Sequence, residues 1–268
     1  MRSPFSKALG VQRIVVLLLL SLAGCGSENG PVLEETFERL YTIQPAANII
    51  IQNHDGAVLI YGSNTNEMRI QATKKAYSSM PLRQITIDVS VQPTSVSINV
   101  KIPPKPRWAL FDRSGTVDCT LVVPATTNIS QLSLDAGEIL VDGMRGRSVH
   151  AKLGDGRMIV HDCFTDTDLA LKRGNLTISY EWWERGTFSI QANITQGNAW
   201  AFLPSEAAFH LVAETAYGRI ANDFDDPAVA RPTSAEATKI DTLVRGGGKA
   251  TIKMRTADGD IKIMEENP

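Results

Sequence analysis

The sequence predicts an all-β protein built as a stack of short repeats, and two observations lead to this prediction. From Ile49 onward apolar residues recur at every second position, as in Val96, Ile98 and Val100, which gives each strand one inward face and one face in water. No stretch of the body keeps the 3.6-residue apolar period of an amphipathic helix. We therefore expect a single β domain over residues 37–268.

Glycine turns recur at a nearly constant spacing in the second half of the chain. They are Gly137, Gly156, Gly174, Gly197 and Gly218, spaced by 19, 18, 23 and 21 residues, and Gly259 follows after a gap of 41, about two repeats. A period near 20 residues is typical of a solenoid, because one unit is too small to bury its apolar face alone. A β-sandwich, which also joins short strands by frequent turns, is the alternative fold.

The first 24 residues have the pattern of an export signal that is removed. Arg2, Lys7 and Arg13 come before or at the start of an aliphatic run over residues 14–22, and no acidic residue lies in the segment. The run is too short for a transmembrane helix, which needs about 20 residues.

Leu22-Ala23-Gly24-Cys25 has the pattern of a bacterial lipobox. Cys25 would then be the first residue of the mature chain and carry acyl chains such as palmitate, each buried methylene contributing about 0.8 kcal/mol to membrane binding. Ordinary secretion with an unmodified cysteine is the alternative. We expect residues 25–36 to form the lipidated cysteine and a flexible tether, and Gly26, which is not aspartate, favours the outer membrane if the cell is Gram-negative.

The charge balance argues against a nucleic-acid partner. Three of the 27 basic residues and none of the 29 acidic residues lie in the leader, so the mature chain has 24 against 29 and a formal charge of −5. A nucleic-acid binder normally has a basic patch or stripe.

Three motifs, taken together, resemble a known family. They are IIIQNHDGAVLIYG at 49–62, the glycine repeats of the middle, and RGGGKATIKMRTADGDIKI at 245–263. These resemble the bacterial putative-adhesin β-helix family (DUF4097-like) over roughly 37–263. The resemblance implies a right-handed β-helix or β-roll, export to the cell envelope, no established enzymatic activity and no catalytic positions to carry over.

The sequence offers few candidate sites beyond Cys25. Cys119 and Cys163 could form a disulfide in an oxidising envelope, or could be two separate buried thiols. The four histidines lack the short spacing of a common zinc site, so we expect no metal and no cofactor. A binding surface could involve Trp108, in a proline-rich loop, and the adjacent Trp182 and Trp183, which would point to opposite faces if they lie on a strand.

These observations favour a non-catalytic, membrane-anchored, adhesin-like or scaffold module, not an enzyme. Its partners would be the membrane, through the lipid, and an envelope protein or glycan, whereas its oligomeric state stays open. The alternatives are a polysaccharide-active β-helix enzyme, which would need converging carboxylates in a groove, and an envelope sensor domain.

Overall fold

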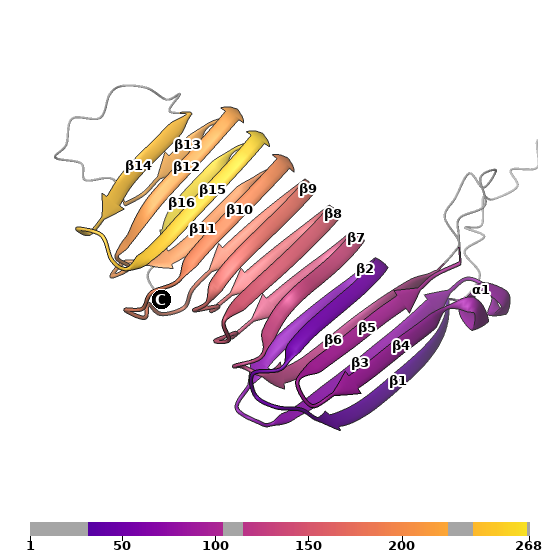
Figure 1. Cartoon of the computed structure of the whole chain (residues 1–268). Coiled ribbons are helices and arrows are strands. Elements are labelled where there is room, and N and C mark those ends of the chain that lie inside the picture. The colour runs from indigo at the N-terminus through magenta and orange to yellow at the C-terminus, as the bar shows by residue number, and fades with distance from the viewer. Residues whose placement is uncertain (1–31, 104–114, 225–237, 267–268) are drawn as a thin grey trace, which may run out of the picture. The chain divides into compact units, whose positions relative to one another are not determined.

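The computed structural model describes residues 32–103, 115–224 and 238–266, which form one 16-stranded sheet and one short helix (Figure 1). The strands are β1 (Leu33–Thr42), β2 (Asn48–Ser63), β3 (Glu67–Ala76), β4 (Thr86–Gln92), β5 (Ser95–Lys101), β6 (Thr116–Pro124), β7 (Asn128–Asp142), β8 (Ser148–His161), β9 (Asp166–Ser179), β10 (Ser189–Gln196), β11 (Ala199–Pro204), β12 (Phe209–Tyr217), β13 (Ile220–Asn222), β14 (Lys239–Val244), β15 (Ala250–Asp258) and β16 (Ile261–Glu266). The helix is α1 (Ser79–Gln84), and no helix in these ranges has the length and apolar character needed to span a bilayer. The predicted all-β class is confirmed.

Parallel strands form the centre of the sheet, in the order β2-β7-β8-β9-β10-β15-β12. The register pairs Ile139 with Met158 and Met158 with Leu176, so each repeat lies directly against the repeat before it. Figure 1 shows these strands side by side along the body. This open, solenoid-like sheet of parallel strands differs from a β-sandwich, in which two antiparallel sheets pack face to face.

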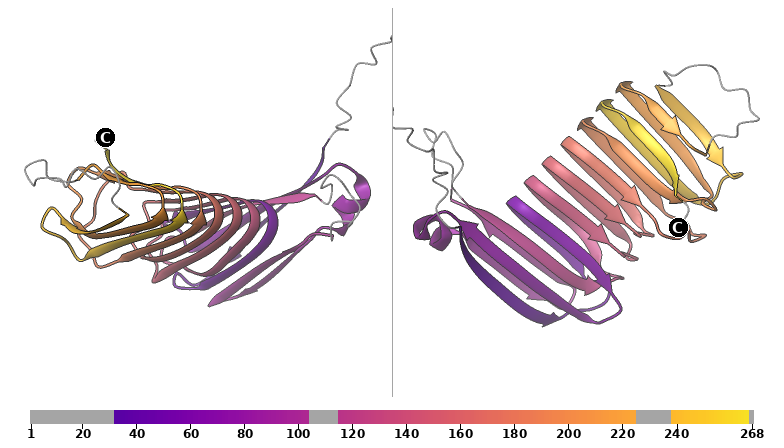
Figure 2. Two further views of the ribbon diagram at one scale, coloured as in Figure 1. Left: turned by 90° about the horizontal axis from the view of Figure 1, so that it is seen from above. Right: turned by 180° about the vertical axis from the view of Figure 1, so that it is seen from behind.

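In each long strand the alternation of buried and exposed residues shifts by one position at a glycine. In β7, Leu132 and Leu134 are buried before Gly137, whereas Ile139 and Val141 are buried after it. The glycine takes a positive φ of 130°, which lets both halves of the strand direct apolar side chains into the same core. The two further views in Figure 2 show the strands following one another along the stack.

The aligned glycines contact one another between neighbouring strands. A Cβ built on Gly156 would lie 1.9 Å from the carbonyl oxygen of Gly137, and one built on Gly174 would lie 1.8 Å from that of Gly156. Only glycine allows this approach of the two backbones, so its recurrence in the sequence has a packing cause in addition to a conformational one. We call this row of contacting glycines the glycine column.

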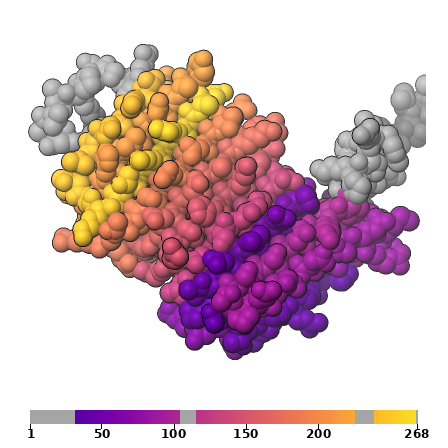
Figure 3. Space-filling view, in the orientation of Figure 1, coloured from indigo at the N-terminus to yellow at the C-terminus, as the bar shows by residue number. Residues whose placement is uncertain are grey.

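The last two strands enter the stack out of sequence order. β15 pairs in parallel with both β10 and β12, and β16 pairs with both β11 and β13. The C-terminal segment, yellow in Figure 3, accordingly lies between two orange bands. Gly259 therefore lies between Gly197 and Gly218 in the glycine column, and not two repeats beyond Gly218 as the linear spacing suggested.

Antiparallel pairs close the N-terminal end of the stack. β6 pairs in parallel with the second half of β2, and β3 and β1 follow it in antiparallel register, while β5 and β4 extend the first half of β2. β1 already begins at Leu33, inside the stretch 25–36 that the sequence assigned to the tether. The predicted signal peptide, Cys25 and most of the predicted tether lie outside the described residues.

The two body cysteines are free thiols buried in the core. Cys119 lies in β6 and Cys163 lies two residues after β8, and the sheet order β6-β2-β7-β8 places two strands between these elements. At about 4.8 Å per strand this separation exceeds the reach of a disulfide, whose Cα atoms lie at most about 7 Å apart. Burial raises the pKa of each thiol to about 12.

Candidate functional site

One cluster of titratable side chains lies where β7, β8 and β9 end. The parallel register places Asp142 beside His161, and His161 beside Ser179, after which the chain enters the loop 180–188. Asp162 follows β8 and Glu181 follows β9, so residues from three successive repeats meet at one edge. We call Asp142, His161, Asp162 and Glu181 the strand-end cluster.

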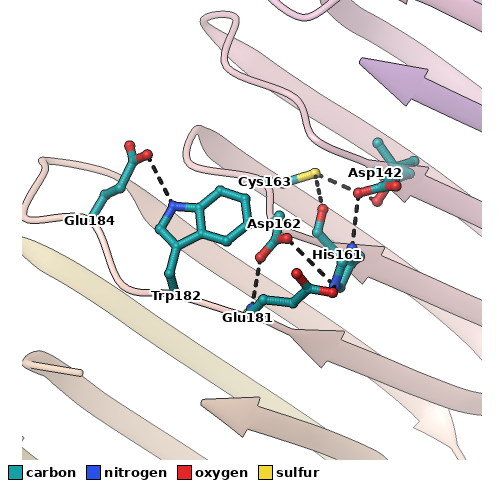
Figure 4. Close-up of polar contacts among 8 residues, drawn as sticks. Asp142, His161, Asp162, Cys163, Glu181, Trp182 and Glu184 are labelled. Carbon is teal, nitrogen blue, oxygen red and sulfur yellow. Dashed lines mark hydrogen bonds and ion pairs between the residues drawn. The ribbon is translucent and has the colours of Figure 1, made fainter. Parts of the chain in front are cut away.

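The imidazole of His161 lies at the centre of the strand-end cluster. Its Nδ1 is 2.9 Å from Oδ1 of Asp142, and its Nε2 is 3.5 Å from Oδ2 of Asp162 and 3.8 Å from Oε1 of Glu181. Figure 4 shows Asp142 on one side of the ring and the other two carboxylates on the opposite side. A carboxylate can only accept a hydrogen bond, so Nδ1 donates to Asp142 and Nε2 faces two further acceptors.

Asp162 is the most buried member of the cluster, with 6% of its side chain exposed. It has a left-handed φ of 47°, a conformation that aspartate tolerates better than most residues, and its Oδ1 accepts the backbone N–H of Glu181 at 2.9 Å. Burial raises the pKa of the Asp162 carboxyl, whereas that backbone hydrogen bond and nearby His161 oppose the shift. The backbone therefore fixes this carboxylate in a poorly hydrated position.

A cavity of about 640 Å³ adjoins the cluster. It is lined by His161, Thr177, Ser179, Tyr180, Glu181, Trp182, Phe202 and Glu266. Polar groups that converge on a partly aromatic cavity are typical of a ligand site. A small oxygen-containing ligand that entered this cavity would meet the imidazole and Glu181 on one side and the aromatic rings on another.

The two adjacent tryptophans lie in the loop between β9 and β10, not on a strand. Trp182 is 42% exposed and donates its indole N–H to Oε1 of Glu184 at 3.2 Å. Trp183 instead packs against the core, with its ring 5.5 Å from that of Phe188. Of the three tryptophans singled out from the sequence, Trp182 thus lines the cavity, Trp183 packs inward and Trp108 lies outside the described residues.

Arg145 holds the aromatic side of the cavity in place. Its guanidinium lies 5.0 Å from the ring centre of Phe164 and 6.0 Å from that of Trp182, and it binds Glu184 at 2.7 Å. The hydrogen bond between them raises the pKa of Arg145 and lowers that of Glu184. The loop is therefore attached to the preceding repeats by the ion pair of Arg145 with Glu184 and by the contacts of Arg145 with the two rings.

A second concavity, of about 910 Å³, crosses six neighbouring strands just before the glycine column. We call it the corner groove, and its lining includes Asp135, Lys152, Lys172, Asn193, Glu214 and Arg255, from β7, β8, β9, β10, β12 and β15. Asp135 pairs with His54 at 2.7 Å and Glu214 with Arg255 at 3.4 Å. The surface is therefore polar and mixed in charge, and its two acidic side chains are already paired.

The strand-end cluster can be recognised in the sequence from residues that are one repeat apart. The spacing between histidines, which indicates common zinc sites, does not reveal it. Asp142 and His161 are 19 residues apart, as are Asp162 and Glu181, and 19 residues is one repeat. His150, by contrast, lies on a different part of β8 and faces Asp168 at 3.8 Å. Pairs separated by the repeat period, and not by helical spacing, identify side chains that meet in a stacked fold.

Comparison with known proteins identifies a family and a fold. The family model described as Toastrack DUF4097 matches residues 46–264. A solved structure from Clostridium sporogenes, described as a putative cell adhesion protein, is 16% identical with a TM-score of 0.50, covering 87% of this chain and 100% of its own. No curated protein matches the chain.

Two other solved structures resemble the chain less closely. A putative adhesin from Bacteroides fragilis is 12% identical with a TM-score of 0.28, and a putative lipid binding protein from Parabacteroides distasonis is 11% identical with a TM-score of 0.33. Each covers 86% of this chain and 97% of its own length.

Proposed function

Because this chain belongs to the Toastrack DUF4097 family, we propose that it is a non-catalytic, adhesin-like binding module held in the cell envelope by a lipid on Cys25. The lipobox pattern at residues 22–25 and the charged, apolar leader before it support the anchor. The outer membrane is the proposed location in a Gram-negative cell, since Gly26 follows the cysteine. The repeats are proposed to wind as a right-handed β-helix, the hand usual for parallel strand connections.

The corner groove is the structural feature that best supports the proposed binding role. Its lining comes from six adjacent strands whose backbones are fixed by hydrogen bonding and by the glycine column, so the surface is rigid. A preformed surface loses little conformational entropy on binding, which favours its use as a docking platform. Its mixed polar lining suits an extended polar polymer, either an envelope glycan or a segment of an envelope protein.

A crosslinked pull-down from native envelope tests this proposal. The lipidated chain should capture a specific partner, and a Cys25→Ala variant should lose it if anchoring places the protein beside that partner. Lys152→Glu together with Lys172→Glu should weaken capture by reversing two charges in the groove, whereas Lys262→Glu, at an exposed position of β16 outside the groove, is the matched control. Equal capture by all charge variants would remove the groove from the proposal.

A polysaccharide-active enzyme is the second candidate, and Asp162 is the observation that favours it. Its raised pKa is a property of general acids in glycoside hydrolysis, and Glu181, which unlike Asp162 lines the cavity, supplies a second carboxyl. Both oxygens of Asp162 already face partners within the protein, which is why we rank this role second. Release of sugars from isolated envelope polysaccharide by wild type, and not by Asp162→Asn, would reverse the ranking.

A further inference from the structure

His161 is positioned in the way that a metal-binding histidine usually is. Metal-ligating imidazoles almost always donate their second ring N–H to a carboxylate or carbonyl, which fixes the tautomer and aims the free nitrogen at the metal. Here Nδ1 donates to Asp142 at 2.9 Å, so the lone pair of neutral His161 lies on Nε2. That lone pair faces Oδ2 of Asp162 and Oε1 of Glu181.

Nε2 of His161 and the two carboxylate oxygens that it faces could share one cation. Nε2 lies 3.5 Å from the Asp162 oxygen and 3.8 Å from the Glu181 oxygen. Tetrahedral zinc binds nitrogen and oxygen ligands at about 2.0–2.2 Å, which puts neighbouring ligand atoms roughly 3.4 Å apart. Nε2 of His161 therefore already lies at close to the ligand-to-ligand spacing of a zinc site from each carboxylate.

The charges around His161 also favour a cation. Three carboxylates surround one imidazole, and the guanidinium of Arg145, which interacts electrostatically with Asp162, is committed to Glu184 at 2.7 Å. Asp162 has only 6% of its side chain exposed, so little water solvates its charge. A bound divalent ion would offset the negative charge of these carboxylates.

We propose that His161, Asp162 and Glu181 bind a divalent transition-metal ion, best matched by zinc, and that Asp142 orients the imidazole as a positioning residue. One nitrogen and two carboxylate oxygens suit zinc or manganese, whereas calcium and magnesium prefer oxygen ligands alone. Cys163 is not a ligand, because its thiol faces the carbonyl oxygens of Val141 and His161. The proposal does not depend on the proposed binding role.

The adjoining cavity would leave a coordination position open to solvent. Glu181 has 71% of its side chain exposed and can swing toward the ion, and the 640 Å³ cavity borders both Glu181 and His161. Three protein ligands and one exchangeable water are the arrangement of an open zinc site. A hydroxyl or carboxylate of a small ligand could replace that water.

Metal uptake by the full-length, untagged protein tests the site. After treatment with a chelator, dialysis against zinc chloride should load one zinc ion per chain, whereas calcium chloride should not. Asp162→Asn and Glu181→Gln should each reduce zinc affinity at least tenfold, and Asp142→Asn should reduce it about 10- to 100-fold without changing the stability of the metal-free protein. The matched control is His54→Gln, which removes an exposed histidine bound to one carboxylate, Asp135 at 2.7 Å.

X-ray absorption of the zinc-loaded wild type gives an answer even if a variant fails to fold. The expected spectrum has nitrogen and oxygen neighbours only, with the signature of one imidazole. Absence of stoichiometric zinc uptake, a sulfur neighbour near 2.3 Å, or full uptake by both Asp162→Asn and Glu181→Gln would each overturn the proposal. In the first of these outcomes the strand-end cluster would be a network of hydrogen bonds and ion pairs without a metal.

Discussion

The glycine column and the strand-end cluster are built by the same repeat, yet they use it in opposite ways. In the column, successive repeats place the same residue at the same position, and the contacts are between backbones. In the cluster, successive repeats place Asp142, His161 and Glu181 next to one another, and the contacts are between different side chains. A solenoid therefore fixes its geometry where the repeat is strict and can build a site where it varies.

The four histidines show how local this variation is. His54, His150 and His210 each face one aspartate on a neighbouring strand, at 2.7, 3.8 and 2.7 Å. His161 alone among the described histidines faces three carboxylates, because the turn after β8 and the loop after β9 add Asp162 and Glu181. Strand pairing provides the first carboxylate, and the connecting segments provide the other two.

Substitution in the glycine column should have the largest effect on stability. Gly156→Ala would place a methyl group 1.9 Å from a backbone oxygen at φ +136°, and we expect it to lower the free energy of unfolding by at least about 3 kcal/mol or to prevent folding. Gly246→Ala separates the two causes, because Gly246 has φ +77° with no atom within 4 Å of the added Cβ. Gly246→Ala should lower the free energy of unfolding by about 1 kcal/mol, measured for both variants by urea denaturation. Equal losses for both variants would mean that contact within the column contributes nothing.

A smaller loss of stability is expected when the buried hydroxyl of Tyr180, next to the strand-end cluster, is removed. The Tyr180 hydroxyl donates to the carbonyl oxygen of Cys163 at 2.6 Å, and both residues are buried. Tyr180→Phe leaves that oxygen without this donor, so the free energy of unfolding should fall by about 1–2 kcal/mol. Tyr217→Phe, at a tyrosine that is 75% exposed, should leave the urea midpoint unchanged. A midpoint for Tyr180→Phe equal to that of wild type would show that the turn tolerates an unpaired carbonyl.

The mildest effect should be a change in pH dependence at the cluster itself. The pKa of Asp162 is raised above its ordinary value of 3.8, so the folded protein binds the proton of this carboxyl group more tightly than the unfolded chain does. The free energy of unfolding should therefore fall as pH rises from about 4 through the folded pKa, and Asp162→Asn should remove this fall. Urea midpoints between pH 4 and pH 7 in the presence of a chelator measure it. Parallel curves for the two proteins would contradict the raised pKa.

Zinc should reverse the direction of that pH dependence. Protons and metal compete for Asp162, Glu181 and His161, so a bound ion stabilises the folded protein more strongly as pH rises. In saturating zinc chloride the urea midpoint of wild type should therefore increase between pH 5 and pH 7. A midpoint that does not respond to zinc at pH 7 would count against the metal site without affecting the partner-binding proposal.

Much of the fold was predictable because it follows from local periodicity. Alternation at Val117, Cys119 and Leu121 correctly gives a strand whose inward face is buried, and Gly137, Gly156 and Gly174 correctly mark stacked positions. The tryptophan pair was less predictable. The sequence around Trp182 and Trp183 does not distinguish a strand from a loop. Packing against Phe164 or Phe188 decides which of the two rings stays exposed.

The β class, the repeat near 20 residues and the family can all be recognised from the sequence, because alternation and glycine spacing are patterns along the chain that do not depend on which strands pair. Tertiary structure alone decided that β15 enters between β10 and β12, since either linear or inserted stacking satisfies the same alternation. It also decided that Asp142, His161, Asp162 and Glu181 meet. Their encounter depends on strand register and on the turns that follow, and these are set by packing across the stack and not by any one segment of the chain.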